Sequence, residues 1–291
     1  MESALMNRRI LVVLADEHAG SNVGLLNPDC ILEKDEFESI VRYSPQLSPY
    51  QEMLWSVHTD HLNTVSNFAN GDEIILFHNG DLTRGNKYWE NWVSPRLSDQ
   101  ILIAFYNIKP WLNMRNVKIA RLSKGTGSHV FGEGSSEILV GELLRREYQD
   151  KDISVVYHGS LGIDGCEIDY AHHGPHPGTR DWLKGNVAQL YLRDLMYRLL
   201  KQGIEPPKII IRAHYHVYVR VVQIVEWGNK EYESTLIICP SYCGPEDYVI
   251  KATRSVDTIV NGLIIIELIN GRVASINPLL EFTDLRIKEI L

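Results

Sequence analysis

Cysteine and long apolar runs are scarce in this sequence of 291 residues, and its 29 lysines and arginines are outnumbered by 37 aspartates and glutamates. Four cysteines without a Cys-x-x-Cys pair form no disulfide framework, which favours a reducing compartment. The formal net charge of -8 gives no electrostatic footprint for long nucleic acid. No apolar stretch approaches the roughly 18 residues that a spanning helix needs, and the first apolar run is too short for a signal peptide. We therefore expect a cytoplasmic protein with no membrane partner.

Short apolar runs alternate with segments of helical periodicity. Residues 10–14 read Ile-Leu-Val-Val-Leu, as expected of a strand that is buried on both faces. Further strands are expected at 73–77, 117–122, 153–161, 166–171 and 208–212, and amphipathic helices at 46–69, 95–114, 137–148 and 186–201. After Val217 the chain is β-rich, with strands expected at 220–227, 233–239, 263–269 and 272–276. This alternation predicts an α/β fold.

Several of these strands are followed at once by aspartate or histidine. In open α/β sheets, ligands bind beyond the carboxyl ends of the strands, so side chains from distant segments can meet there. Imidazole and carboxylate without thiolate suit Mn, Fe, Zn or similar divalent ions. The candidate ligands are Asp16, His18, Asp81, one histidine of the His172–His173 pair, His214 and His216.

The spacing and number of the candidates indicate two ions. Asp16 and His18 are two residues apart, as are His214 and His216, and such pairs face the same side of an extended segment. Six protein ligands are too many for one open tetrahedral site and suit two ions that share a carboxylate. Two such ions commonly activate water and stabilise displacement at phosphorus.

The order of these motifs resembles the calcineurin-like metallophosphoesterase superfamily. Asp-x-His, Gly-Asp, Gly-x-His, His and His-x-His follow one another between about Ile10 and Val217. The resemblance implies two packed mixed β-sheets flanked by helices, a four-layer α/β/β/α architecture. It implies a single domain over residues 1–291, with a motif core at 8–217 and a β-rich part at 218–291 that completes the second sheet.

The resemblance also implies a role for each candidate. Two divalent ions are implied, with Mn preferred over Fe, Zn, Ni or Mg. The first ion would be held by Asp16, His18 and His216. The second would be held by His172 and His214, with Asp81 bridging both. His129 would act near the leaving group as an acid or electrostatic stabiliser. The unused histidine of the pair, His173, would contact substrate, and Arg84 could bind a phosphate.

The third motif departs from the family pattern. Ser128 stands where the family usually has an asparagine that binds the second metal, and Glu133 and Glu137 are the nearby substitutes. Glu137 also has a structural interpretation, because it would lie in the first turn of a helix, where negative charge is favoured. The block Gly125 to His129 is similar to the Gly-Thr-x-x-His block of phage-type members.

The function expected from this pattern is hydrolysis of phosphate esters by attack of a metal-activated water, with a phosphodiesterase or nuclease favoured. The partner would be a phosphate-ester substrate, such as a nucleotide or a nucleic-acid end. The aromatic cluster Tyr88, Trp89 and Trp92 could stack a nucleobase, or pack as a lid or in the core. The alternatives are a phosphomonoesterase or protein phosphatase and, from another class, a binding scaffold that keeps the fold without turnover.

Overall fold

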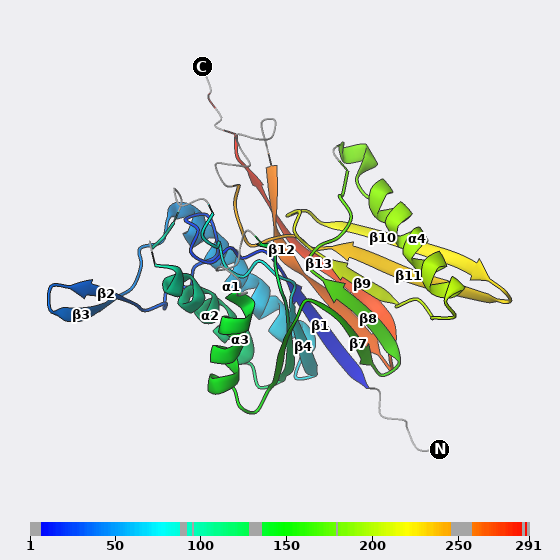
Figure 1. Ribbon diagram of the computed structural model, residues 1–291, viewed down its shortest axis with the longest axis horizontal. Coiled ribbons are helices and arrows are strands. Elements are labelled where there is room, and N and C mark those ends of the chain that lie inside the picture. The colour runs from blue at the N-terminus through cyan, green and yellow to red at the C-terminus, as the bar shows by residue number, and fades with distance from the viewer. Residues whose placement is uncertain are drawn as a thin grey trace.

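Two β-sheets pack face to face in this chain (Figure 1). The computed structural model describes residues 7–87, 92–94, 96–127, 136–178, 180–245, 258–286 and 289. The first sheet has the strand order β13 (Arg272–Asp284), β12 (Thr258–Ile269), β1 (Arg8–Leu14), β4 (Glu73–His78), β5 (Val117–Ser123) and β6 (Asp152–Val156). The second has the order β10 (Val219–Trp227), β11 (Lys230–Ile238), β9 (Ile209–Arg212), β8 (Cys166–Ala171) and β7 (His158–Ile163).

Helices cover the outer face of each sheet (Figure 1). The helices are α1 (Pro49–Ala69), α2 (Leu97–Leu112), α3 (Ser136–Glu147) and α4 (Asn186–Lys201), and a short 3-10 helix, η3, spans Asp181–Leu183. Side chains of α1, α2 and α3 share one buried cluster with the first sheet, and side chains of α4 share another with the second sheet. A third cluster lies between the sheets. The predicted four-layer α/β/β/α architecture is therefore confirmed.

The continuous apolar run of β1 follows from its place between two layers. Ile10, Val12 and Leu14 face the helices, whereas Leu11 and Val13 face the second sheet. Successive side chains of a strand point to opposite faces, so a strand covered on both sides needs apolar residues throughout. β1 pairs in parallel with β4, and β4 pairs in parallel with β5. The carboxyl ends of these strands consequently meet at one edge of the sheet.

The C-terminal part divides between the two sheets. β10 and β11 lie in the second sheet, but β12 and β13 extend the first, with β12 antiparallel to β1. The expectation that residues 218–291 complete the second sheet is therefore wrong for β12 and β13. The run Leu263 to Ile266 is buried on both faces and suits a position inside the first sheet, next to β1. The assignment of 1–291 to a single domain stays a prediction.

Two further expectations about strands are corrected. Residues 153–161 do not form one strand, because β6 ends at Val156 and β7 begins at His158 in the other sheet. A hairpin that was not expected is formed by β2 (Leu32–Glu36) and β3 (Ser39–Tyr43). Most of its side chains are exposed or half-buried, so it lacks the apolar periodicity from which a strand is predicted. Within the described residues, no helix combines the length and hydropathy that a membrane crossing requires.

The two histidines of α1, His58 and His61, contact aromatic side chains of other segments. His58 is 1% exposed, and its Nε2 accepts a hydrogen bond of 2.8 Å from the indole N–H of Trp111. The ring of His61 is half-buried, and its Nδ1 lies 2.8 Å from the hydroxyl of Tyr242. This pair holds α1 against α2 and the segment after β11, and has a structural role.

Neutral His58 makes the stability of the protein depend on pH. Burial lowers the pKa of His58 to about 3, with a smaller effect from His61. In the unfolded chain the imidazole regains its ordinary pKa of about 6.5, so the unfolded state binds more protons between these two values. The stabilisation is complete above pH 6.5 and is lost as the pH falls toward 3.

Between pH 6.5 and 5 we expect the wild type to lose about 2 kcal/mol more unfolding free energy than His58→Gln, since one pH unit is worth about 1.4 kcal/mol per proton. Urea denaturation of both proteins at each pH measures the difference. Equal losses in the two proteins would contradict a buried, neutral His58.

Candidate metal centre

The loops after β1 and β4 run side by side beyond the edge of the first sheet. The backbone N–H of Asp16 donates to the carbonyl of Gly80 at 3.0 Å, and that of His18 donates to the carbonyl of Asp81 at 3.1 Å. These bonds continue the pairing of the two strands past their ends. Asp16, His18 and Asp81 are thereby held next to one another, and each is nearly fully buried.

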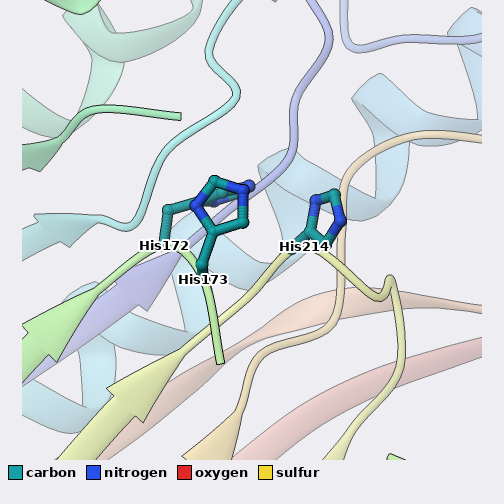
Figure 2. Close-up of side chains that lie close together, drawn as sticks. All are labelled: His172, His173 and His214. Atoms are coloured by element: carbon teal, nitrogen blue, oxygen red, sulfur yellow. The ribbon is translucent and has the colours of Figure 1, made fainter. Parts of the chain in front are cut away.

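The second sheet contributes histidines from the ends of β8 and β9. Figure 2 shows His172 and His173 beyond the end of one strand and His214 beyond the end of the next, with the three rings close together. The centroid of the His172 ring lies 5.0 Å from that of His173 and 5.3 Å from that of His214. The backbone N–H of His214 donates to Asp16 Oδ2 at 3.2 Å, which joins the two sheets at this site.

All six predicted metal ligands meet in this region. Their donor atoms, together with those of His173, form three groups, each with its atoms within 4.8 Å of one another. The groups are Asp16 with His18 and His216, then His172 with His173 and His214, and finally Asp16 with Asp81 and His172. The first two groups share no residue, and the third connects them. The arrangement therefore offers two neighbouring ion positions.

The individual distances agree with this division. Asp16 Oδ1 lies 3.3 Å from His216 Nε2 and 3.9 Å from His18 Nε2. Asp81 Oδ2 lies 3.0 Å from His172 Nε2, 4.0 Å from His18 Nε2 and 4.0 Å from His214 Nδ1. Asp81 thus faces histidines of both groups, as a carboxylate shared by two ions would.

The electrostatics of the site fit a bound cation. Asp16 and Asp81 are buried together, and two buried carboxylates require compensating positive charge. Among the described residues, Asp16 Oδ1 accepts no hydrogen bond. Burial by itself would raise the pKa of Asp16, but His216 and His18 hold it well below its usual range. Burial likewise opposes the charged form of His172, yet Asp81 raises the pKa of that imidazole to about 9. Bound divalent ions would supply the positive charge that protonated histidines otherwise provide to these carboxylates.

Five of the six predicted ligands have a left-handed backbone. Their φ angles lie between 47° and 77°: Asp16, His18, Asp81, His214 and His216. The spacing of Asp16 with His18, and of His214 with His216, predicted extended backbone at both pairs. The left-handed φ angles show that this prediction is wrong. A left-handed conformation of a residue other than glycine costs on the order of 1–3 kcal/mol and persists only where the surrounding structure enforces it. Such residues cluster at functional sites. This is local strain of the kind that accompanies a pre-organised site.

Asn79 fixes the orientation of His172. Its side-chain amide donates to the carbonyl of Ala171 at 2.9 Å and accepts from the hydroxyl of Ser123 at 2.8 Å. The backbone carbonyl of Asn79 accepts a 2.7 Å hydrogen bond from Nδ1 of His172, so Nδ1 carries a proton and Nε2 is the ring atom that faces Asp81. Outer partners of this kind orient metal-binding histidines. This role of Asn79 was not predicted from the sequence, although a polar residue directly after an apolar strand indicates a position near the site.

Thr126 is a second residue whose role the sequence did not reveal. Its backbone N–H donates to Asp81 Oδ1 at 2.5 Å, and its hydroxyl lies 3.0 Å from Asp81 Oδ2. The same hydroxyl lies 3.2 Å from His172 Nε2 and 3.1 Å from His214 Nδ1. A neutral oxygen is therefore present among the donors of the second group. Ser128, the position where the family pattern has a neutral ligand, lies outside the described residues. The Gly-Thr-x-x-His block was the feature of the sequence that could have indicated Thr126.

The other predicted residues have different outcomes. His129, Glu133, Tyr88 and Trp89 lie outside the described residues. His173 is exposed, and its Nε2 lies 3.4 Å from the hydroxyl of Thr126. Arg84 is 2% exposed, and its contact with a phosphate stays a prediction. Glu137 is buried in the first turn of α3, where its Oε1 accepts a 3.3 Å hydrogen bond from the backbone N–H of Leu82.

Comparison with known proteins gives only distant similarities. Neither the protein-family models nor the curated proteins contain a match. Among solved structures, an archaeal phosphodiesterase is similar with a TM-score of 0.37 and 12% identity over 89% of this chain and 99% of that one. A metallophosphoesterase from Sphaerobacter thermophilus has a TM-score of 0.35 and 13% identity over 93% and 88%. Vps29 from Entamoeba histolytica, complexed with zinc, has 0.34 and 12% over 95% and 99%.

Proposed function

We propose that this protein is a metal-dependent phosphoesterase that uses two divalent ions. The observation that carries the proposal is the pair of donor groups, Asp16 with His18 and His216 and His172 with His173 and His214, which the third group with Asp81 connects. One ion would be held by Asp16, His18 and His216, and the other by His172 and His214, with Asp81 between them. We propose manganese as the metal among the divalent ions, such as Mn, Fe and Zn, that mixed nitrogen and oxygen donors suit.

The ions, when bound, would supply Lewis-acid activation of water and of the phosphoryl oxygens. The residues of the chain have separate tasks. The left-handed loops hold Asp16 and Asp81 in place before metal arrives, so that little reorganisation accompanies binding. Asn79 keeps His172 in the tautomer that offers Nε2 to the site. His129 is proposed to donate a proton to the departing oxygen.

We further propose that the substrate is a phosphodiester, and that it is a nucleotide or a nucleic-acid end. Two features of the sequence support this: the Gly-Thr-x-x-His block and the aromatic residues around Trp92. The net charge of -8 favours a small or terminal substrate over a long duplex, because neutralising a duplex backbone needs a broad basic surface. Phosphomonoesterase and scaffold functions remain as outcomes of the test.

Removal of metal tests the proposal. The protein, stripped with a chelator and refilled with Mn, should bind two ions per chain and hydrolyse bis-p-nitrophenyl phosphate, whereas the stripped protein should be at least roughly 100-fold slower. Bound metal is counted by elemental analysis, and hydrolysis is followed by release of p-nitrophenol. Faster cleavage of p-nitrophenyl phosphate than of the diester would favour a monoesterase. Absence of both metal and turnover would favour a scaffold.

A further inference from the structure

A small pocket adjoins the metal centre on the side of its second donor group. It has a volume of about 150 Å³ and shares His172 and His173 with the site. Its other walls come from both sheets and from α4, and include Lys124, Tyr157 and Arg212. A group bound there would therefore lie beside whatever the ions hold.

The lining of this pocket is suited to an anion. Among the described residues that line it are two permanent cations, Lys124 and Arg212, and no carboxylate. Arg212 is 2% exposed and is compensated by Asp169, whose Oδ1 lies 2.6 Å from its Nη2. Lys124 has no counter-ion in the described part of the chain, so its charge is left for a ligand. The local charge at this pocket is therefore positive, whereas the net charge of the chain is -8.

Lys124 is fixed in position by the loop that builds the metal centre. Its backbone N–H donates to the carbonyl of Val156 at 2.8 Å, directly after the end of β5. Two residues later, Thr126 contacts Asp81 and His214. The lysine backbone is thus held close to Thr126, which contacts Asp81 and the second donor group. A flexible lysine on a fixed backbone can follow a phosphate as a point charge.

The size of the pocket limits what it binds. Sites for a complete small-molecule ligand measure roughly 300–1,000 Å³, so about 150 Å³ holds one group of a ligand and not the whole. Tyr191 adds a hydroxyl to the wall, and this hydroxyl lies 3.4 Å from Arg212 Nη2. We propose that this pocket binds a second phosphate of the substrate, next to the ester that is cleaved, with Lys124 as its main contact. The substrate is then an oligonucleotide or a nucleotide with more than one phosphate, an inference that rests on the proposed phosphoesterase function.

The test compares substrates of equal size that differ by one charge. Thymidine trinucleotide contains two diesters, and in each of its two methylphosphonate isomers one of them is replaced by an uncharged isostere. For at least one isomer, the wild type should show a KM about tenfold higher than for the trinucleotide, the effect of one charge-assisted contact. Lys124→Gln should raise KM for the trinucleotide to that level and leave KM for this isomer unchanged. Lys124→Arg should retain most of the difference.

Lys208→Gln is the matched control, because Lys208 lies at the opposite end of β9 and lines a different pocket. It should change none of these constants. Equal KM values for all three substrates, or an equal rise for all three in Lys124→Gln, would overturn the inference while leaving the phosphoesterase function intact.

A measurement without metal separates the two proposals fully. Calorimetric titration of the metal-free wild type with inorganic phosphate should show binding that is about tenfold weaker in Lys124→Gln and unchanged in Lys208→Gln. If no substrate is cleaved but this binding difference is found, the phosphoesterase function fails and the phosphate pocket stands. If the wild type and Lys124→Gln bind phosphate equally, or neither binds it, the pocket assignment is wrong.

Discussion

Asp81→Asn should abolish most hydrolysis and release at least one of the two ions. Asp81 Oδ2 faces His172 at 3.0 Å and both His18 and His214 at 4.0 Å, so its charge would serve both of the proposed ion positions. Asparagine has nearly the same shape but brings no charge, and the cations would lose the anion between them. Loss of an outer partner of a metal ligand costs roughly 10–100-fold, so loss of a shared ligand should cost more than roughly 100-fold in kcat/KM.

The measurement combines elemental analysis of bound metal with kcat/KM for bis-p-nitrophenyl phosphate at saturating Mn. Asp60→Asn is the control, because Asp60 is an exposed carboxylate on α1 and the substitution makes the same change in charge. The control should keep two ions and full activity. An Asp81→Asn protein that retained both would show that Asp81 is not the shared ligand.

The general plan of this site could be predicted from the sequence. Buried parallel strands appear as continuous apolar runs, and their carboxyl ends meet at one edge, so the sequence predicts that Asp16 and Asp81 meet. The same reasoning brought His172 and His214 to the site from the second sheet. These side chains could be predicted to meet because each buried strand is visible in the sequence as a continuous apolar run.

The details of the site could not be predicted because they depend on single contacts. Asp16 and His214 have a left-handed backbone. No local pattern of residues predicts it, because it depends on contacts with neighbouring loops. Thr126 reaches the site because the loop after β5 folds back over Asp81, which is a tertiary event. The exposed hairpin formed by β2 and β3 was missed because it buries too little to produce a periodic pattern.

Gly125→Ala should disrupt the metal centre although Gly125 is not itself a ligand. A Cβ on Gly125 would overlap the Oδ1 and the backbone nitrogen of Asp81, and the backbone at Gly125 has no positive φ that would add strain. Relief would require the loop that carries Thr126 to move away from Asp81, which would break the 2.5 Å bond from the Thr126 N–H. Because an orienting partner of a ligand is lost, we expect Mn affinity to fall by roughly 10–100-fold, with kcat/KM falling in parallel.

Gly127→Ala separates this steric effect from a general effect of replacing glycine in the loop. No described atom lies within 4 Å of a Cβ at Gly127, so the added methyl meets none of the residues that the structure describes. Alanine at such a position restricts the unfolded chain and stabilises the fold by roughly 0.4–1 kcal/mol. Gly127→Ala should therefore keep wild-type Mn affinity in a calorimetric titration and unfold at a slightly higher temperature. If both variants bound Mn as the wild type does, Asp81 would not depend on the close approach of Gly125, and the loop after β5 would be free to shift without cost to the site.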